Sequence, residues 1–83
     1  MVGGLVHGNI PESTYENAAT CFRKAIELNP QRLMHHIELG CTYCEMGKAA
    51  EAKKLIKKGL SMRETEKDDP ETKRRGRKVL GSI

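Results

Sequence analysis

Aromatic residues are scarce in this chain of 83 residues, which contains no Trp, two Tyr and one Phe. Aromatic side chains supply much of the buried area of a small core, and a core of this size rarely contributes more than ~3–5 kcal/mol. The chain is also shorter than the typical domain of ~100–150 residues. These limits disfavour an enzyme with a deep, enclosed active site, so we expect a non-catalytic protein without a cofactor.

Long hydrophobic runs are also missing from the sequence. No apolar stretch approaches the ~20 residues that a membrane-spanning helix needs, so we expect no membrane span. The segment Met1–Ile10 is too short and too rich in glycine to contain the apolar part of a signal peptide. The three cysteines are therefore predicted to be free thiols in a reducing, intracellular compartment, and we expect a cytoplasmic protein.

Alternation of apolar and polar residues with period two is absent, and helical spacing is present instead. The sequence predicts an all-α protein with a loose N-terminal segment, residues 1–12, followed by one helical domain, residues 13–83. Proline, glycine and capping residues delimit four helices in this domain. Their expected ranges are about 13–28, 31–46, 48–61 and 70–81.

The first expected helix begins with a capping box, in which Ser13 takes a free backbone N–H and Glu16 reaches back to the cap residue. It ends at Asn29, because the residue before Pro30 is pushed out of the helical region. Its predicted apolar face consists of Ala18, Cys21, Phe22, Ala25, Ile26 and Leu28.

The other three expected helices differ in how many of their sides are apolar. The second has two apolar stripes, which is typical of a helix sandwiched between neighbours, and Gly47 stops it. The third is apolar on one side and carries four lysines on the other. The fourth opens with Asp69 as its cap and Pro70 as its first residue. Its narrow inner stripe consists of Thr72, Gly76, Val79, Leu80 and Ile83.

A weak internal repeat supplies the most specific fold signal. Shifting the chain by 34 residues aligns Ala18 with Ala52 and Phe22 with Ile56. That period belongs to the tetratricopeptide repeat, whose consensus is similar to the segment from His36 through Leu39-Gly40 to Tyr43. We therefore expect tetratricopeptide-like helix-turn-helix repeats, an alpha-alpha superhelix fragment, with a C-terminal capping helix.

Several segments extend the likeness beyond a generic repeat. They are Pro11–Ala18, Ala25–Pro30, His36–Gly40 and, most distinctively, Lys67–Arg75. Together they resemble the C-terminal part of the regulator-of-microtubule-dynamics proteins, above all the plant members. This resemblance implies an intracellular tetratricopeptide protein that works by protein–protein contact. It also implies association with microtubules and the cytoskeleton, or with mitochondria as in other members of that family.

The functional hypothesis is a non-catalytic protein–protein interaction module associated with microtubule regulation. The alternative is a structural fragment of a longer solenoid without a binding function of its own. In that case the uncovered face of the first helix would drive self-association. A third alternative is a small metal or redox module on Cys41-x2-Cys44. We expect no bound metal, because no second pair of ligands follows and a small apolar role suits free cysteines.

Two candidate protein-binding surfaces follow from the helical pattern. In stacked repeats the first helix of each pair lines the concave surface. Its residues here are apolar and mildly acidic, which suits an amphipathic helix as partner. They are Met34, Ile37, Glu38, Cys41, Cys44 and Glu45.

The second candidate surface is the basic run of the last helix, which consists of Lys73, Arg74, Arg75, Arg77 and Lys78. It is interpreted either as the solvated outer face of a capping helix or as an electrostatic contact for the acidic tails of tubulin. Nucleic acid is not expected as a partner, because no aromatic residue lies between the charges to stack on bases.

Overall fold

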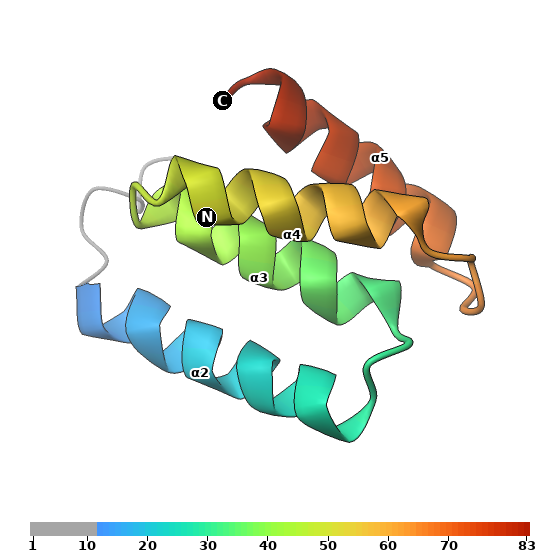
Figure 1. Ribbon diagram of the computed structural model, residues 1–83, viewed down its shortest axis with the longest axis horizontal. Coiled ribbons are helices and arrows are strands. Elements are labelled where there is room, and N and C mark those ends of the chain that lie inside the picture. The colour runs from blue at the N-terminus through green and yellow to red at the C-terminus, as the bar shows by residue number, and fades with distance from the viewer. Residues whose placement is uncertain (1–11) are drawn as a thin grey trace, which may run out of the picture.

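The structure, a computed structural model, describes residues 12–83, and this part of the chain forms four α-helices and no strand (Figure 1). The expectation of an all-α fold is confirmed. The loose segment predicted for residues 1–12 lies almost entirely outside the described residues. The helices are α2 (Glu12–Leu28), α3 (Leu33–Glu45), α4 (Ala49–Ser61) and α5 (Asp69–Gly81).

Helix α3 lies at the centre of the arrangement and contacts all three other helices. α4 also packs against α5, whereas α2 contacts α3 alone among the described helices. Figure 1 shows the consequence, with α2 and α5 on opposite sides of the α3–α4 pair. This layered order of antiparallel helices is compatible with a fragment of a helical-repeat protein.

The core is small and is built around residues that let helices approach closely. Ile37 on α3 and Ile56 on α4 are completely buried. A Cβ atom added at Gly40 would lie 2.6 Å from Cγ1 of Ile56, which is closer than real Cβ contacts allow. The absence of a side chain at Gly40 therefore permits the close packing of α3 on α4. The fully or almost fully buried hydrophobic residues are Ala19, Leu33, Ile37, Leu39, Ala52 and Ile56.

Helix ends agree with the sequence where glycine or proline sets them. α2 stops at Leu28, just before Asn29-Pro30, and Gly47 takes a φ of 82° after the end of α3. Two starts differ from the prediction. α2 begins at Glu12, so Ser13 lies inside the first turn and is not the N-cap. α3 begins at Leu33, because a turn with the Arg32 N–H bonded to the Asn29 carbonyl precedes it.

The apolar face of α2 also differs from the prediction. Ala19 is buried against α3, although it was not expected in the core. Cys21 is exposed and 81% of Leu28 is accessible, so both point away from α3. The predicted apolar face of α2 therefore includes two neighbouring stripes of the helix, and α3 covers only one of them.

Asp69 has a different role from the predicted cap of α5. It is the first residue of that helix, 1% exposed, and Asp68 precedes the helix as its N-cap without a side-chain hydrogen bond. The Asp69 Oδ2 accepts the backbone N–H groups of Thr65 and Glu66, each at 2.8 Å. This carboxylate therefore fixes the α4–α5 connection, where backbone donors would otherwise lack a partner.

Replacing Asp69 by asparagine is expected to lower the free energy of unfolding by about 1 kcal/mol, because hydrogen bonds to a charged acceptor are stronger than neutral ones. Asp68→Asn is the matched control, since the exposed Asp68 side chain makes no capping hydrogen bond. Urea unfolding followed by circular dichroism measures both. Equal midpoints for the two variants would contradict the role of Asp69.

Candidate protein-interaction surfaces

The stripe predicted to line a concave groove is partly covered by α5. Ile37 is 0% exposed, and the backbone of α5 at Gly76 lies so close that an added Cβ would be 3.1 Å from its Cγ2. Glu38 forms an ion pair with Arg75 of α5. The expectation that Ile37 is available to a partner is therefore wrong. Met34 is half-buried on the same helix.

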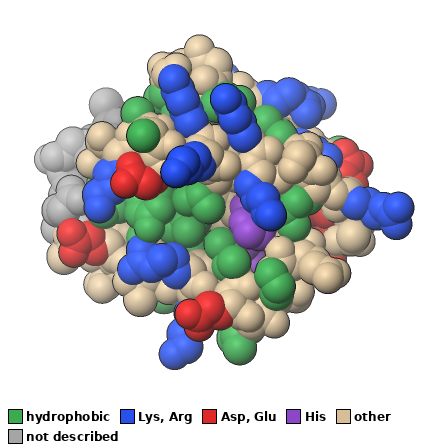
Figure 2. Space-filling model, in the orientation of Figure 1, with side chains coloured by type: hydrophobic (Ala, Val, Ile, Leu, Met, Phe, Trp, Pro, Cys, Tyr) green, Lys and Arg blue, Asp and Glu red, His purple; other side chains and the backbone are tan. Residues whose placement is uncertain are grey.

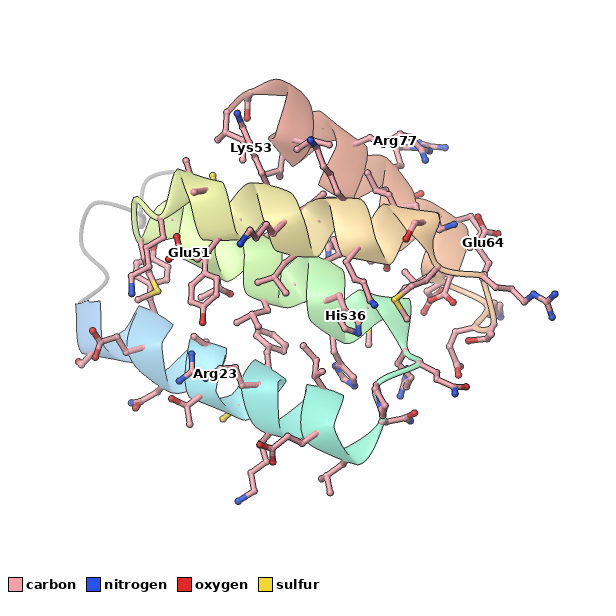
Figure 3. The ribbon with its side chains drawn as sticks, in the orientation of Figure 1. Arg23, His36, Glu51, Lys53, Glu64 and Arg77 are labelled. Carbon is pink, nitrogen blue, oxygen red and sulfur yellow. The ribbon has the colours of Figure 1, made fainter. Side chains whose placement is uncertain are left out.

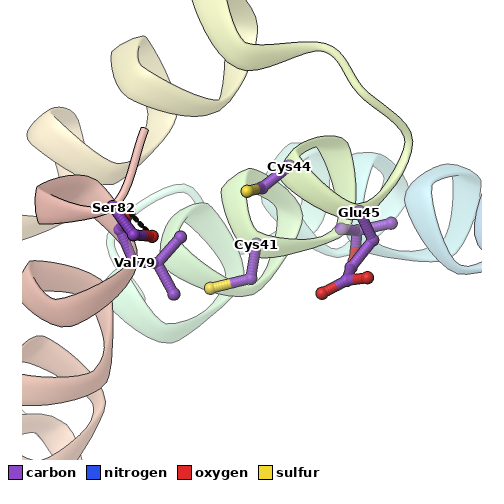
Figure 4. Close-up of a pocket in the computed structure, with 6 residues that line it drawn as sticks. Cys41, Cys44, Glu45, Val79 and Ser82 are labelled. Carbon is purple, nitrogen blue, oxygen red and sulfur yellow. Dashed lines mark hydrogen bonds between the residues drawn. The ribbon is translucent and has the colours of Figure 1, made fainter. Parts of the chain in front are cut away.

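The C-terminal half of the stripe remains accessible. Cys41, Cys44 and Glu45 of α3 line a hollow of about 250 Å³ together with Val79 of α5 and with Ser82, which follows α5. The two sulfur atoms lie on the side of α3 that faces α5 (Figure 4). This part of the predicted stripe therefore lines an open hollow at the ends of α3 and α5.

The thiols in this hollow differ from the exposed one on α2. Burial raises the pKa of the Cys41 thiol, and the neighbouring Cys44 and Glu45 raise it further. A higher pKa lowers the fraction of reactive thiolate at neutral pH. Within residues 12–83, no group of three or more His, Cys, Asp or Glu residues is placed to hold a metal ion. Its raised pKa and partial burial favour a packing role for Cys41 over a redox role.

We expect iodoacetamide to alkylate Cys21 several-fold faster than Cys41 in the folded chain at pH 7.5. Cys21 is exposed, whereas Cys41 is half-buried and its pKa is raised. The rates are measured by peptide mass spectrometry after timed quenching. The same chain unfolded in urea serves as control, because unfolding exposes both cysteines and removes the burial that raises the pKa of Cys41. Equal rates in the folded chain would contradict the structure.

The two histidines of α3, His35 and His36, belong to the framework of the fold. His36 is 7% exposed, and its Nε2 lies 2.9 Å from the carbonyl oxygen of Pro30, which ties α3 to the turn before it (Figure 3). This burial and this contact give His36 a packing role in the core. Burial lowers the pKa of His35, and the nearby charges of Arg32 and His36 lower it further. The lowered pKa disfavours the charged form of His35.

Ion pairs divide the basic run of α5 into two groups. Lys73 is only 14% exposed and pairs with Glu64 at 4.0 Å, so it does not lie on the outer face as predicted. Arg75 pairs with Glu38, and Arg74 with Glu71 at 3.9 Å. Arg77 and Lys78, by contrast, are exposed and have no ion pair within residues 12–83.

Helix α4 carries a second group of unpaired cations, the four lysines that the sequence places on its polar side. Lys53, Lys54, Lys57 and Lys58 are exposed, and none has an ion pair in the described part of the chain. They form two like-charged pairs at a spacing of four residues, and such pairs repel each other. The spacing of these lysines in the sequence could have predicted that positive charge is concentrated on α4.

Positive charge gathers in the second half of the molecule. Residues 48–83 contain twelve Lys and Arg against six Asp and Glu, whereas residues 1–47 contain three against five. Figure 2 shows the face of the molecule seen in Figure 1, with several Lys and Arg side chains over the part that α4 and α5 form. Lys53 of α4 and Arg77 of α5 lie along the same side of the molecule (Figure 3). The basic surface is therefore shared by two helices.

A separate polar contact joins α2 to the end of α3. The Arg23 Nη1 donates to the Tyr43 hydroxyl at 2.7 Å, and its Nη2 donates to the Thr20 hydroxyl at 3.2 Å. The Lys48 Nζ lies 5.7 Å from the centre of the Tyr43 ring, within range of a cation–π interaction. Arg23 thus joins α2 to α3 and Lys48 contacts Tyr43, so these two cations are not counted in the basic surface of α4 and α5.

Within residues 12–83 the fold is all-helical, and most of the Lys and Arg side chains of α4 and α5 are exposed. A family model described as Regulator of microtubule dynamics protein 1-3 matches residues 1–83. The chain therefore belongs to this family, which confirms the resemblance seen in the sequence. The family name indicates a role in the regulation of microtubule dynamics.

Two further comparisons gave no match, one with curated proteins and one with solved structures. None of the helices within residues 12–83 has the length and apolar character needed to cross a membrane.

Proposed function

We propose that this chain is a non-catalytic protein-interaction module that takes part in microtubule regulation from a cytoplasmic, cytoskeleton-associated position. Its helices serve as a tetratricopeptide-like scaffold that presents side chains to a protein partner. The family match and the outer faces of α4 and α5 support this proposal. The observation that carries it is the group of exposed lysines on α4, which have no ion pair within the described residues.

Tubulin is the proposed partner, because a basic surface attracts an acidic one over several ångströms and accelerates encounter. Arg77 of α5 lies on the same side of the molecule as Lys53 of α4 (Figure 3), and Lys78 is a further exposed cation of α5. Contacts of this kind weaken as salt screens them. The hollow at Cys41, Cys44 and Glu45 is a second contact point, with room for an apolar side chain of a partner helix.

Co-sedimentation with microtubules across a salt series tests this function. We expect the chain to pellet at low ionic strength and to be released as salt rises. Lys53→Glu with Lys57→Glu should abolish pelleting, whereas Lys24→Glu with Lys67→Glu changes the net charge equally at other exposed positions and should preserve most of it. Absence of pelleting at the lowest salt would refute microtubule binding.

A second candidate function is that of a structural element completed by another helix. Ala18, Cys21, Ala25 and Leu28 recur at alternating spacings of three and four residues on α2, and 81% of Leu28 is accessible. Such a stripe suits a coiled-coil-like contact with an amphipathic helix or a second copy. Analytical ultracentrifugation distinguishes these outcomes. A concentration-dependent dimer that Leu28→Glu converts to monomer would support self-association.

A further inference from the structure

A hollow of about 440 Å³ lies beside the C-terminal end of α4, away from the hollow at Cys41. It is formed where the α2–α3 turn meets the residues that follow α4. Its lining consists of Pro30, Gln31, Lys58, Met62, Arg63 and Thr65. Lys58 belongs to the basic surface of α4 described above, but the hollow itself has no role in the proposed function.

The charges around this hollow are unbalanced in favour of cations. Lys58 and Arg63 are exposed and have no ion pair within the described residues. The nearest acidic residues in the sequence are already engaged, since Glu64 pairs with Lys73 at 4.0 Å and Glu66 with Arg32 at 3.9 Å. The hollow therefore presents two cations that form no ion pair within the described residues.

The hollow also has an apolar part. Pro30 and the half-buried Met62 lie among its lining residues. A methionine side chain is flexible and adapts to the shape of an apolar group that packs against it. The site thus combines a surface for an apolar side chain with two cations beside it.

Helix α4 extends the cationic character away from the hollow. Lys54 lies four residues before Lys58, which places both on the same helix face one turn apart. Repulsion between these two lysines destabilises α4 slightly, and an anion bound across them removes that repulsion. An extended acidic chain that runs along α4 would meet Lys54 first and the hollow last.

We propose that this hollow binds the C-terminal residue of an acidic polypeptide. Its α-carboxylate pairs with Lys58 and with the planar guanidinium of Arg63, which can hold a carboxylate by two parallel hydrogen bonds. Its last side chain packs against Met62 and Pro30, and preceding acidic residues follow α4 to Lys54. The inference rests on the proposed function in one respect, namely that the partner is a protein.

Fluorescence anisotropy with two labelled peptides tests this site. Both are short oligoglutamates that end in leucine, one with a free carboxylate and one amidated. We expect amidation to weaken binding by roughly tenfold, the effect of one charge-assisted hydrogen bond. Lys58→Gln with Arg63→Gln should weaken the free-carboxylate peptide by a similar factor and remove the difference between the peptides. Lys24→Gln with Lys67→Gln is the matched control and should preserve that difference.

The outcomes separate this site from the proposed function. Equal binding of the two peptides by the unmodified chain, or no binding of either, overturns the site even if the chain pellets with microtubules. Peptide discrimination without pelleting supports the site and refutes microtubule binding. Stronger competition by inorganic phosphate than by the amidated peptide, at equal charge concentration, would show a general anion site and would also overturn the proposal. Thermal melting verifies that the exposed substitutions leave the fold intact.

Discussion

Replacement of Ile37 by alanine is expected to unfold most of the chain at 25 °C. Ile37 is 0% exposed and lies between the backbones of α4 and α5 at Gly59 and Gly76. Truncating a buried isoleucine to alanine typically costs 2–5 kcal/mol, about as much as the whole core of so small a domain supplies (~3–5 kcal/mol). The glycines opposite carry no side chains that could move in to fill the cavity.

Two substitutions calibrate this expectation. Ile37→Val removes one methylene and should lower the free energy of unfolding by about 0.5–1.5 kcal/mol. Leu28→Ala removes a larger part of a side chain that is 81% exposed, and should change it by less than ~0.5 kcal/mol. Urea titrations followed by circular dichroism measure all three variants. A folded Ile37→Ala protein with an unchanged midpoint would contradict the structure and place this side chain on the surface, as the predicted concave stripe requires.

The misplacement of Ile37 shows where sequence reasoning reaches its limit in this fold. Helical spacing identifies which residues of α3 share a stripe, because it depends only on neighbours along the chain. Whether that stripe is open to solvent depends on α5, which begins more than thirty residues after Ile37 and packs onto α3. The all-α fold and the breaks near Pro30 and Gly47 were predictable, because local backbone chemistry determines them.

The candidate surfaces likewise depend on contacts between elements that lie far apart in the sequence. The sequence identifies the basic residues, but their ion pairs join different elements, as when Arg75 of α5 meets Glu38 of α3. Pairing removes Lys73 and Arg75 from the predicted surface and leaves Arg77 available. The hollow beside Lys58 combines the α2–α3 turn with the end of α4, so no single segment of the sequence predicts it.

Gly59→Ala is expected to destabilise the protein by about 2 kcal/mol, although alanine is normally the better helix former by about 1 kcal/mol. The added Cβ would overlap Cγ1 of Ile37 and lie 3.1 Å from its Cδ1. It would also lie 3.3 Å from the Leu33 carbonyl oxygen, so backbone as well as side chain would have to move. Ile37 is fully buried against α5 as well, which leaves it no direction in which to retreat.

The melting temperature provides the measurement, since 1 kcal/mol corresponds to roughly 4–8 °C in a domain of this size. Gly81→Ala is the matched control, because a Cβ at that helical position would meet no atom within 4 Å. It should leave the melting temperature unchanged or raise it slightly. If Gly59→Ala raised it as well, helix propensity would outweigh the steric overlap, and α3 and α4 would have to lie further apart than the structure places them. A decrease in Gly59→Ala alone would support the close approach of the two helices around Ile37.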